Sequence, residues 1–123
     1  MPGKDEVSSF IRSTFPSVWA LELLCFLRRH RDEEWTETSL VAAMRSSELV
    51  VAQSVRSLLA AGLVIVGGQN QVRYQPASVS LDELADATER LYSQRPDFVR
   101  RTIVSASSSP VRRFADAFKL RKD

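Results

Sequence analysis

The 123-residue sequence predicts a mainly α-helical fold that contains one small β-hairpin. Three observations lead to this prediction. Apolar residues recur at helical spacing in segments such as 17–31 and 48–61. Two short β-prone runs, "LVIV" at 63–66 and "QVRYQ" at 71–75, flank the turn sequence "GGQN". Serine and threonine residues also stand where the helices should begin, as helix N-caps commonly do.

Composition limits the classes of protein to consider. A chain of this length with 44% hydrophobic residues suits one compact domain. The net charge of +2 is too small to indicate a nucleic-acid binder by itself. The charges are unevenly distributed, however, because the segment after Phe98 holds seven basic residues against two acidic ones. The basic residues are Arg100, Arg101, Arg112, Arg113, Lys119, Arg121 and Lys122, and the acidic ones are Asp116 and Asp123.

Several functions find no support in the sequence. No apolar stretch approaches the roughly 20 residues of a membrane span, and no signal peptide opens the chain, so we expect a cytoplasmic protein without a membrane partner. One cysteine, Cys25, and one histidine, His30, cannot form a structural zinc site, and we expect no cofactor. No phosphate-binding glycine loop or nucleophile–histidine signature is present, so we expect no enzymatic activity.

The first segment of the chain, residues 1–16, mixes polar residues with the apolar stretch "SSFIRSTF". We expect a flexible start, or a segment that docks through Phe10, Ile11 and Phe15. Ser17 then caps the first predicted helix, "SVWALELLCFLRRHR", in which apolar residues recur at helical spacing.

Two further helices and a hairpin should follow. Thr36 or Thr38 can cap a short helix, "SLVAAMR", and Ser47 can cap a third helix over residues 48–61. Gly62 suits the left-handed position that often ends a helix. The "GGQN" turn should supply the positive-φ residues of a tight reversal between the two β-prone runs. These elements would together form a three-helix unit that ends in a hairpin.

The remainder of the chain should be helical. Ser80 and Glu83 have the spacing of a capping box, which predicts a fourth helix. Pro96 can start another helix, "PDFVRRTIVSA". Ser109 and Pro110 have the cap and first-position residues of a last helix, "PVRRFADAFKL", which carries apolar residues along one stripe.

The order helix, short helix, break, helix, Gly-Leu-Val and hairpin, over roughly residues 17–75, resembles that of winged helix-turn-helix proteins. The segment "VAQSVRSLLAAGLVIV" is similar to the end of the recognition helix in bacterial winged-helix regulators, with the general layout of the MarR and PadR classes. The resemblance implies a winged-helix domain at 17–78, with its recognition helix at about 47–61 and its wing at about 63–76. Residues 79–123 would then form a C-terminal helical region that dimerises.

Helical spacing assigns two faces to the third helix. The residues expected to pack inward are Val51, Val55, Leu58 and Leu59. Those expected to point outward are Leu49, Gln53, Arg56 and Ala60, with Val50 and Ser57 at the edges.

The resemblance implies a sequence-specific transcriptional regulator that binds double-stranded DNA as a homodimer. In that role Gln53 and Arg56 would read base edges, because amide and guanidinium groups pair with bases in the major groove. Ser47 and Ser57 would contact phosphates, and the wing would contact the DNA backbone through Gln69, Asn70 and Arg73. The residues expected at the dimer interface are Leu84, Leu91, Phe114 and Phe118.

The outward face also supports an alternative function. It carries few donors for base edges, and Leu49 and Val50 are apolar where a donor would be useful. The protein could instead be a winged-helix protein-interaction module that docks a partner through these two residues and the C-terminal amphipathic helix.

Other conspicuous residues have ordinary structural interpretations. Arg28 and its neighbours end the first helix, where cations interact favourably with the helix dipole. Cys25 and both tryptophans, Trp19 and Trp35, are expected to pack in the core or between helices, and His30 is expected at the surface.

Overall fold

The computed structural model of the protein describes residues 2–107, which form six α-helices and a two-stranded antiparallel sheet. The elements are α1 (Lys4–Thr14), α2 (Val18–Arg29), α3 (Glu37–Met44), α4 (Glu48–Ala60), β1 (Val64–Val66), β2 (Val72–Tyr74), α5 (Val79–Gln94) and α6 (Pro96–Ser107). A short 3-10 turn, Gly68–Asn70, connects the strands. The predicted fold class, mainly helical with a small hairpin, is confirmed. The last predicted helix, from Ser109, lies outside the described residues.

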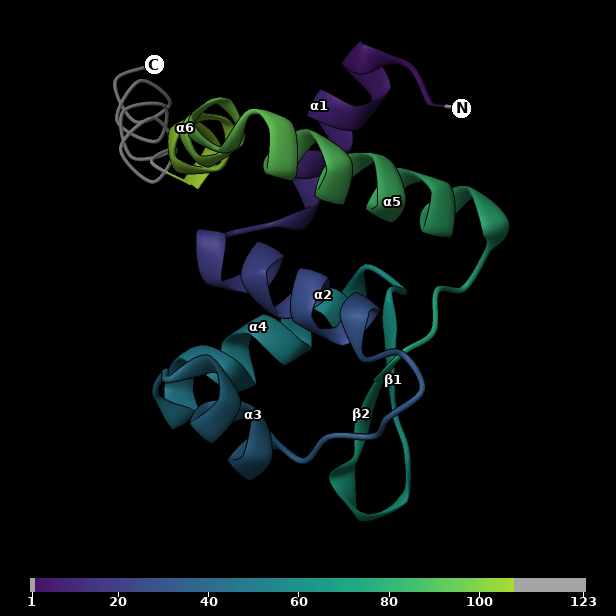
Figure 1. The fold of residues 1–123 in the computed structure, drawn as a ribbon, viewed down its shortest axis with the longest axis vertical. Helices are drawn as coiled ribbons and strands as arrows, with labels where there is room; N and C mark the ends of the chain where they lie inside the picture. The colour runs from purple at the N-terminus through teal and green to yellow at the C-terminus, as the bar shows by residue number, and fades with distance from the viewer. Residues whose placement is uncertain (1, 108–123) are drawn as a thin grey trace, which may run out of the picture.

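Helix α2 lies between two layers (Figure 1). The layer of α3, α4 and the hairpin packs on one side of it, and α1, α5 and α6 lie on the other side. A helix between two layers has to be apolar around most of its circumference. In agreement, Leu21, Leu23, Leu24 and Leu27 are all completely or almost completely buried. The single hydrophobic core therefore runs through α2 and joins both layers.

The N-terminal segment is a helix, which the sequence did not lead us to expect. Val7, Phe10 and Ile11 recur at helical spacing in α1 and are buried against α5 and α6. Phe15 follows the helix, is also buried, and meets Phe10 edge-on with 5.8 Å between the ring centroids. The three residues singled out for docking are thus buried, but from a helical segment that begins at Lys4.

Most predicted helix caps are confirmed, and one is wrong. The hydroxyl groups of Ser17, Thr36 and Ser47 each accept a hydrogen bond from the backbone N–H three residues later. The helix predicted to follow Ser80, however, has its cap two residues earlier, at Ser78. Ser78 has an extended backbone and its hydroxyl accepts from the N–H of Leu81 at 3.2 Å. Ser80 already lies in the first turn of α5, so it cannot act as the cap.

The hairpin has the predicted strands but a different turn. Val64 pairs with Tyr74 and Val66 with Val72. The positive φ angles fall within "GGQN", as predicted, at Gln69 (63°) and Asn70 (58°) and not at its two glycines. The reason is that the reversal is longer than a two-residue turn, so its left-handed positions come after the glycines. This loop is closed by the hydrogen bond that the N–H of Gly67 donates to the carbonyl of Gln71, at 2.8 Å.

The connection between α2 and α3 adds a third short segment to the sheet. Trp35 and Val72 form an isolated antiparallel bridge, in which each backbone N–H donates to the other residue's carbonyl. Trp35 also packs against Phe26, with 4.8 Å between the ring centroids. The start of α3 is therefore attached to β2, the second strand of the hairpin.

No single helix in residues 2–107 combines the length and the apolar composition of a membrane span. Helices α1 and α2 meet those criteria only as a joined pair, and the chain bends by 111° between them.

Candidate nucleic-acid interface

The inner face of α4 positions this helix against α2. Val51, Val55 and Leu58 are buried as predicted, and Ser54 is buried beside them. Leu59 was predicted to pack inward as well, but it is 45% exposed. One residue corresponds to about 100° of rotation around a helix, so Leu59 points away from the stripe on which Leu58 lies. Burial of this stripe leaves the opposite face of α4 accessible.

The outer face of α4 carries Leu49, Gln53 and Arg56, spaced by four and three residues. All three are exposed, and Leu49 is 63% exposed. Within the described residues, the side chains of Gln53 and Arg56 make no hydrogen bond or ion pair. The two predicted base-reading residues therefore lie on one face with their polar groups free.

The two serines predicted to contact phosphates already have structural partners. The Ser47 hydroxyl accepts a hydrogen bond from the N–H of Val50 at 3.1 Å, as the N-cap of α4. Its own proton remains available for donation. The Ser57 hydroxyl donates to the carbonyl of Gln53, also at 3.1 Å, and this residue is only half-exposed. Ser57 is consequently a poorer phosphate ligand than Ser47.

The junction between α4 and β1 is a tight backbone motif. Gly62 has a φ of 77°, as predicted for a left-handed position. Its N–H donates to the carbonyl of Leu59, and the N–H of Leu63 donates to the carbonyl of Leu58, both at 3.0 Å. These two bonds define a Schellman motif, and the buried side chains of Leu58 and Leu63 complete it. The hairpin consequently leaves α4 at a defined angle.

The hairpin tip lies beside the start of α3. Thr36, Glu37 and Thr38 line a shallow cleft together with Gln69 and Asn70. Both of these tip residues are exposed. Arg73, the third predicted wing residue, is half-buried and donates from Nη2 to the side-chain oxygen of Gln75 at 2.8 Å. The tip thus presents the amide side chains of Gln69 and Asn70, and the nearby Arg73 is hydrogen-bonded to the uncharged side chain of Gln75.

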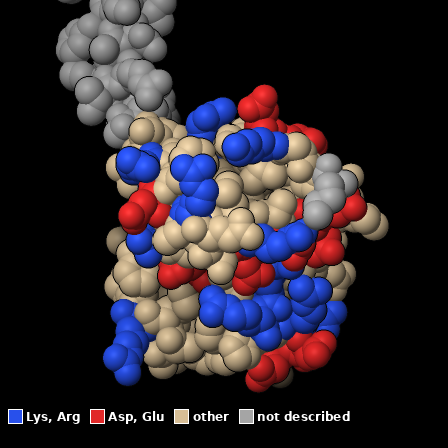
Figure 2. Space-filling model, turned by 45° about the horizontal axis from the view of Figure 1, so that its top comes forward, with Lys and Arg blue, Asp and Glu red and all other residues tan. Residues whose placement is uncertain are grey.

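Positive charge on this part of the molecule is sparse. Residues 35–75 contain three cations, Arg45, Arg56 and Arg73, and two acids, Glu37 and Glu48. On the face shown in Figure 2, basic and acidic side chains are intermixed over much of the surface, and several basic side chains adjoin one another in the lower part of the view. Any nucleic-acid contact by residues 35–75 would therefore depend on a few individual cations.

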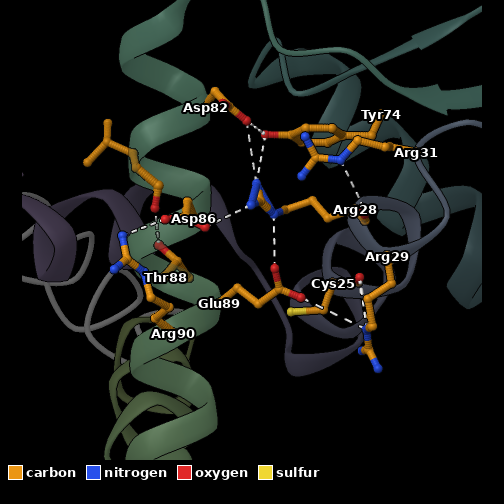
Figure 3. Close-up of polar contacts among 11 residues, drawn as sticks. Cys25, Arg28, Arg29, Arg31, Tyr74, Asp82, Asp86, Thr88, Glu89 and Arg90 are labelled. Atoms are coloured by element: carbon orange, nitrogen blue, oxygen red, sulfur yellow. Dashed lines mark hydrogen bonds and ion pairs between the residues drawn. The ribbon is translucent and has the colours of Figure 1, made fainter. Parts of the chain in front are cut away.

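The main polar cluster of the protein was not predicted. Arg28, on α2, is 6% exposed and extends toward α5 (Figure 3). Its Nε and Nη2 atoms lie 3.0 Å from carboxylate oxygens of Glu89 and Asp86, respectively. Its Nη1 atom donates to the Tyr74 hydroxyl at 3.1 Å and lies 3.5 Å from Asp82. Arg28 is therefore a buried link between α2, α5 and β2, and not simply a cation at a helix end.

A signal for this cluster was present in the sequence. Arg28 is four residues after Leu24, on the buried face of its helix. Asp82, Asp86 and Glu89 follow one another at spacings of four and three, which aligns them along one face of α5. An arginine on the buried face of a helix needs a carboxylate partner, because an unpaired buried charge is costly. The acidic stripe on α5 could supply that partner.

Tyr74 joins the hairpin to the same cluster. Its hydroxyl donates to a carboxylate oxygen of Asp82 at 2.6 Å, and the Arg31 guanidinium lies 5.4 Å from the centre of its ring. Burial, together with the hydrogen bond to Asp82, raises the pKa of Tyr74 well above its ordinary value. Tyr74 therefore stays protonated and acts as a hydrogen-bond donor at neutral pH.

Cys25 is a core residue, as predicted, with 2% of its surface exposed. Burial raises the pKa of its thiol from 9.0 to about 12, and the Glu89 carboxylate acts in the same direction. The thiol is consequently protonated at neutral pH and is a poor nucleophile.

We expect the Cys25 thiol to make stability fall at alkaline pH. The unfolded chain loses this proton near pH 9, whereas the folded protein keeps it until about pH 12. The stabilisation is therefore complete below pH 9 and is lost above it, by up to about 1.4 kcal/mol per pH unit. Urea unfolding of the wild type and Cys25→Ala between pH 8 and 11 measures the difference. Parallel stability curves for the two proteins would contradict the expectation.

The predicted dimer residues divide into two groups. Leu84 and Leu91 are half-buried and pack against the core of their own chain. Phe114 and Phe118 lie outside the described residues. The burial of the first pair leaves only part of each side chain available to a second copy.

An apolar patch lies beside the start of α4. Trp19, predicted to pack inside, is instead 44% exposed, because it precedes the fully buried part of α2. It lines a small depression together with Met44 and Val50, and Leu49, the residue before Val50 on α4, is exposed. The patch thus combines residues from α2, α3 and α4.

In the described part of the chain, no group of three or more His, Cys, Asp or Glu residues is placed to hold a metal ion. Neither a protein-family model, nor a curated protein, nor a solved structure matches this chain. Its function is therefore inferred from the geometry.

Proposed function

We propose that residues 17–78 form a winged helix-turn-helix domain and that the protein is a sequence-specific, DNA-binding transcriptional regulator. The order of α2, α3, α4 and the hairpin supports this proposal, as does the short bridge between Trp35 and Val72. The observation that carries it is the pair Gln53 and Arg56, exposed and unpartnered on the outer face of α4.

The chemistry of this face suits base recognition in the major groove. A guanidinium can donate two hydrogen bonds to guanine, and a glutamine amide can pair with adenine. Leu49, on the same stripe, would contact the methyl group of thymine. The Schellman motif at Gly62 holds the hairpin at a constant angle to α4. In a single orientation on DNA, α4 could therefore contact the bases while the hairpin, as the wing, contacts the backbone.

The sparse charge favours binding as a homodimer. Each half-site would gain few phosphate contacts from the described residues, and two linked copies would double that number. The proposed dimer would use the C-terminal helical region, in which the sequence places five further basic residues after Ser107. Such a dimer would bind a palindromic DNA site.

We expect selection from a random duplex library to enrich one motif, and Arg56→Ala to reduce discrimination at one base position. A lost bidentate contact should cost about 1–3 kcal/mol of specificity. Fluorescence anisotropy with the enriched duplex and with single-base variants measures this effect. Arg12→Ala, which removes an exposed and unpartnered arginine from α1, is the matched control and should retain full discrimination.

A second candidate function is supported by the patch of Trp19, Met44, Leu49 and Val50. Exposed apolar groups at the start of the outer face of α4 suit a protein partner better than they suit phosphate. The library selection separates the two functions. If no motif is enriched and Arg56→Ala behaves as the wild type, DNA recognition is wrong and protein docking becomes the leading function.

A further inference from the structure

Helices α3 and α4 both end at a left-handed residue whose following N–H donates five residues back, but the left-handed residue differs between them. At the end of α4, Gly62 is left-handed and the following N–H, of Leu63, donates to a carbonyl five residues back. At the end of α3, Arg45 is left-handed (φ 53°, ψ 47°), and the N–H of Ser46 donates to the carbonyl of Val41 at 3.2 Å. Arg45 therefore occupies the position that glycine occupies in α4.

A left-handed backbone is strained for arginine, because its Cβ approaches the following carbonyl oxygen. Glycine is the usual residue at this position, and asparagine is the next choice. The non-glycine residues with positive φ in the described chain are Arg45, Gln69 and Asn70. All three lie on the α3–α4 turn or the hairpin tip, within the proposed DNA-binding unit, and strained residues concentrate at functional sites.

Contacts within the described protein do not account for an arginine here. Arg45 is exposed, and its side chain makes no hydrogen bond or ion pair in residues 2–107. A cation does interact favourably with the negative end of α3. If stabilising the end of α3 were the only role of this residue, however, glycine would serve at least as well, because it avoids the left-handed strain. The arginine is better explained by a partner outside the protein.

We infer that Arg45 is a phosphate-contacting residue for DNA, an inference that rests on the proposed function. Arg45 directly follows the last residue of α3 and lies two residues before Ser47, the cap of α4. Arg56 lies about 13 Å along the axis of α4 from Ser47, at 1.5 Å per residue. In helix-turn-helix docking, the recognition helix enters the groove while the preceding helix crosses the sugar-phosphate backbone. Arg45, at the end of that preceding helix, would lie beside the backbone while Arg56 reads bases.

Three full-length variants test this inference: Arg45→Gly, Arg45→Lys and the control Arg12→Ala. Arg45→Gly should raise the melting temperature by about 2–4 °C, because glycine relieves the left-handed strain. It should nevertheless weaken binding to the enriched duplex and to a scrambled duplex alike, by about 3- to 10-fold near physiological salt. The slope of log affinity against log salt should become shallower by about one. Arg45→Lys should keep the wild-type slope, and Arg12→Ala should match the wild type throughout.

The outcomes separate this inference from the proposed function. If the wild type enriches a motif and Arg56→Ala loses discrimination, but Arg45→Gly binds like Arg12→Ala, only the phosphate contact is wrong. If Arg45→Gly lowers both melting temperature and affinity, Arg45 serves α3 and the inference is overturned. If the wild type enriches no motif, the proposed function fails and the inference fails with it.

Discussion

Arg28→Met is expected to lower the free energy of unfolding by about 2–4 kcal/mol. Methionine fills a similar volume but leaves Asp82, Asp86 and Glu89 without their shared cation. Three like charges along one face of α5 would then repel one another beside a buried surface. Their partial exposure, 28–43% of each side chain, keeps the cost below that of fully buried charges.

Urea denaturation at pH 7 measures this loss, and Arg29→Met supplies the matched control. Arg29 is the next residue on α2, but its side chain is 65% exposed and lies 3.9 Å from Glu89. Its replacement should change stability by no more than about 0.5 kcal/mol. Equal losses in the two variants would show that the Arg28 cluster contributes no more than a surface ion pair.

Phe15→Ala is expected to destabilise the protein by about 3–4 kcal/mol. The side chain is 1% exposed, and its removal would leave a cavity between the end of α1 and the core. Thermal unfolding followed by circular dichroism measures the loss. Leu49→Ala, at a position 63% exposed, is the control and should unfold near the wild-type temperature. A small effect at Phe15 would mean that α1 is only loosely attached.

Local signals in the sequence predicted the elements well where packing follows helical spacing. The buried stripe of α4 and the left-handed Gly62 depend on residues within one or two turns, so both could be predicted. Leu59 was misassigned because the inner stripe is narrower than the run of apolar residues. Trp19 was misassigned because its exposure depends on where the neighbouring helices end.

The features that could not be predicted depend on contacts between distant segments. Val7, Phe10 and Ile11 have helical spacing, but α1 is stabilised by packing against α5 and α6. The spacing of Arg28 on α2 and of its carboxylate partners on α5 is a signal, but more than fifty residues separate them, so local spacing could not pair them. The left-handed conformation of Arg45 likewise contradicts its local preference, so only the three-dimensional structure could show it.

Both ends of β2 are held by other parts of the protein, Val72 by the backbone bridge to Trp35 and Tyr74 by side chains of α2 and α5. Tyr74, the last residue of β2, is bound to Asp82 of α5 and to Arg28 of α2, whereas Gln69 and Asn70 project into solvent. The hairpin is thus attached to α5 at its base and to the α2–α3 connection nearer its turn. A displacement of α5 that breaks the Tyr74–Asp82 bond would shift the base of the hairpin, while the Trp35–Val72 bridge would hold the end nearer the turn. The position of the hairpin is in this sense coupled to that of α5.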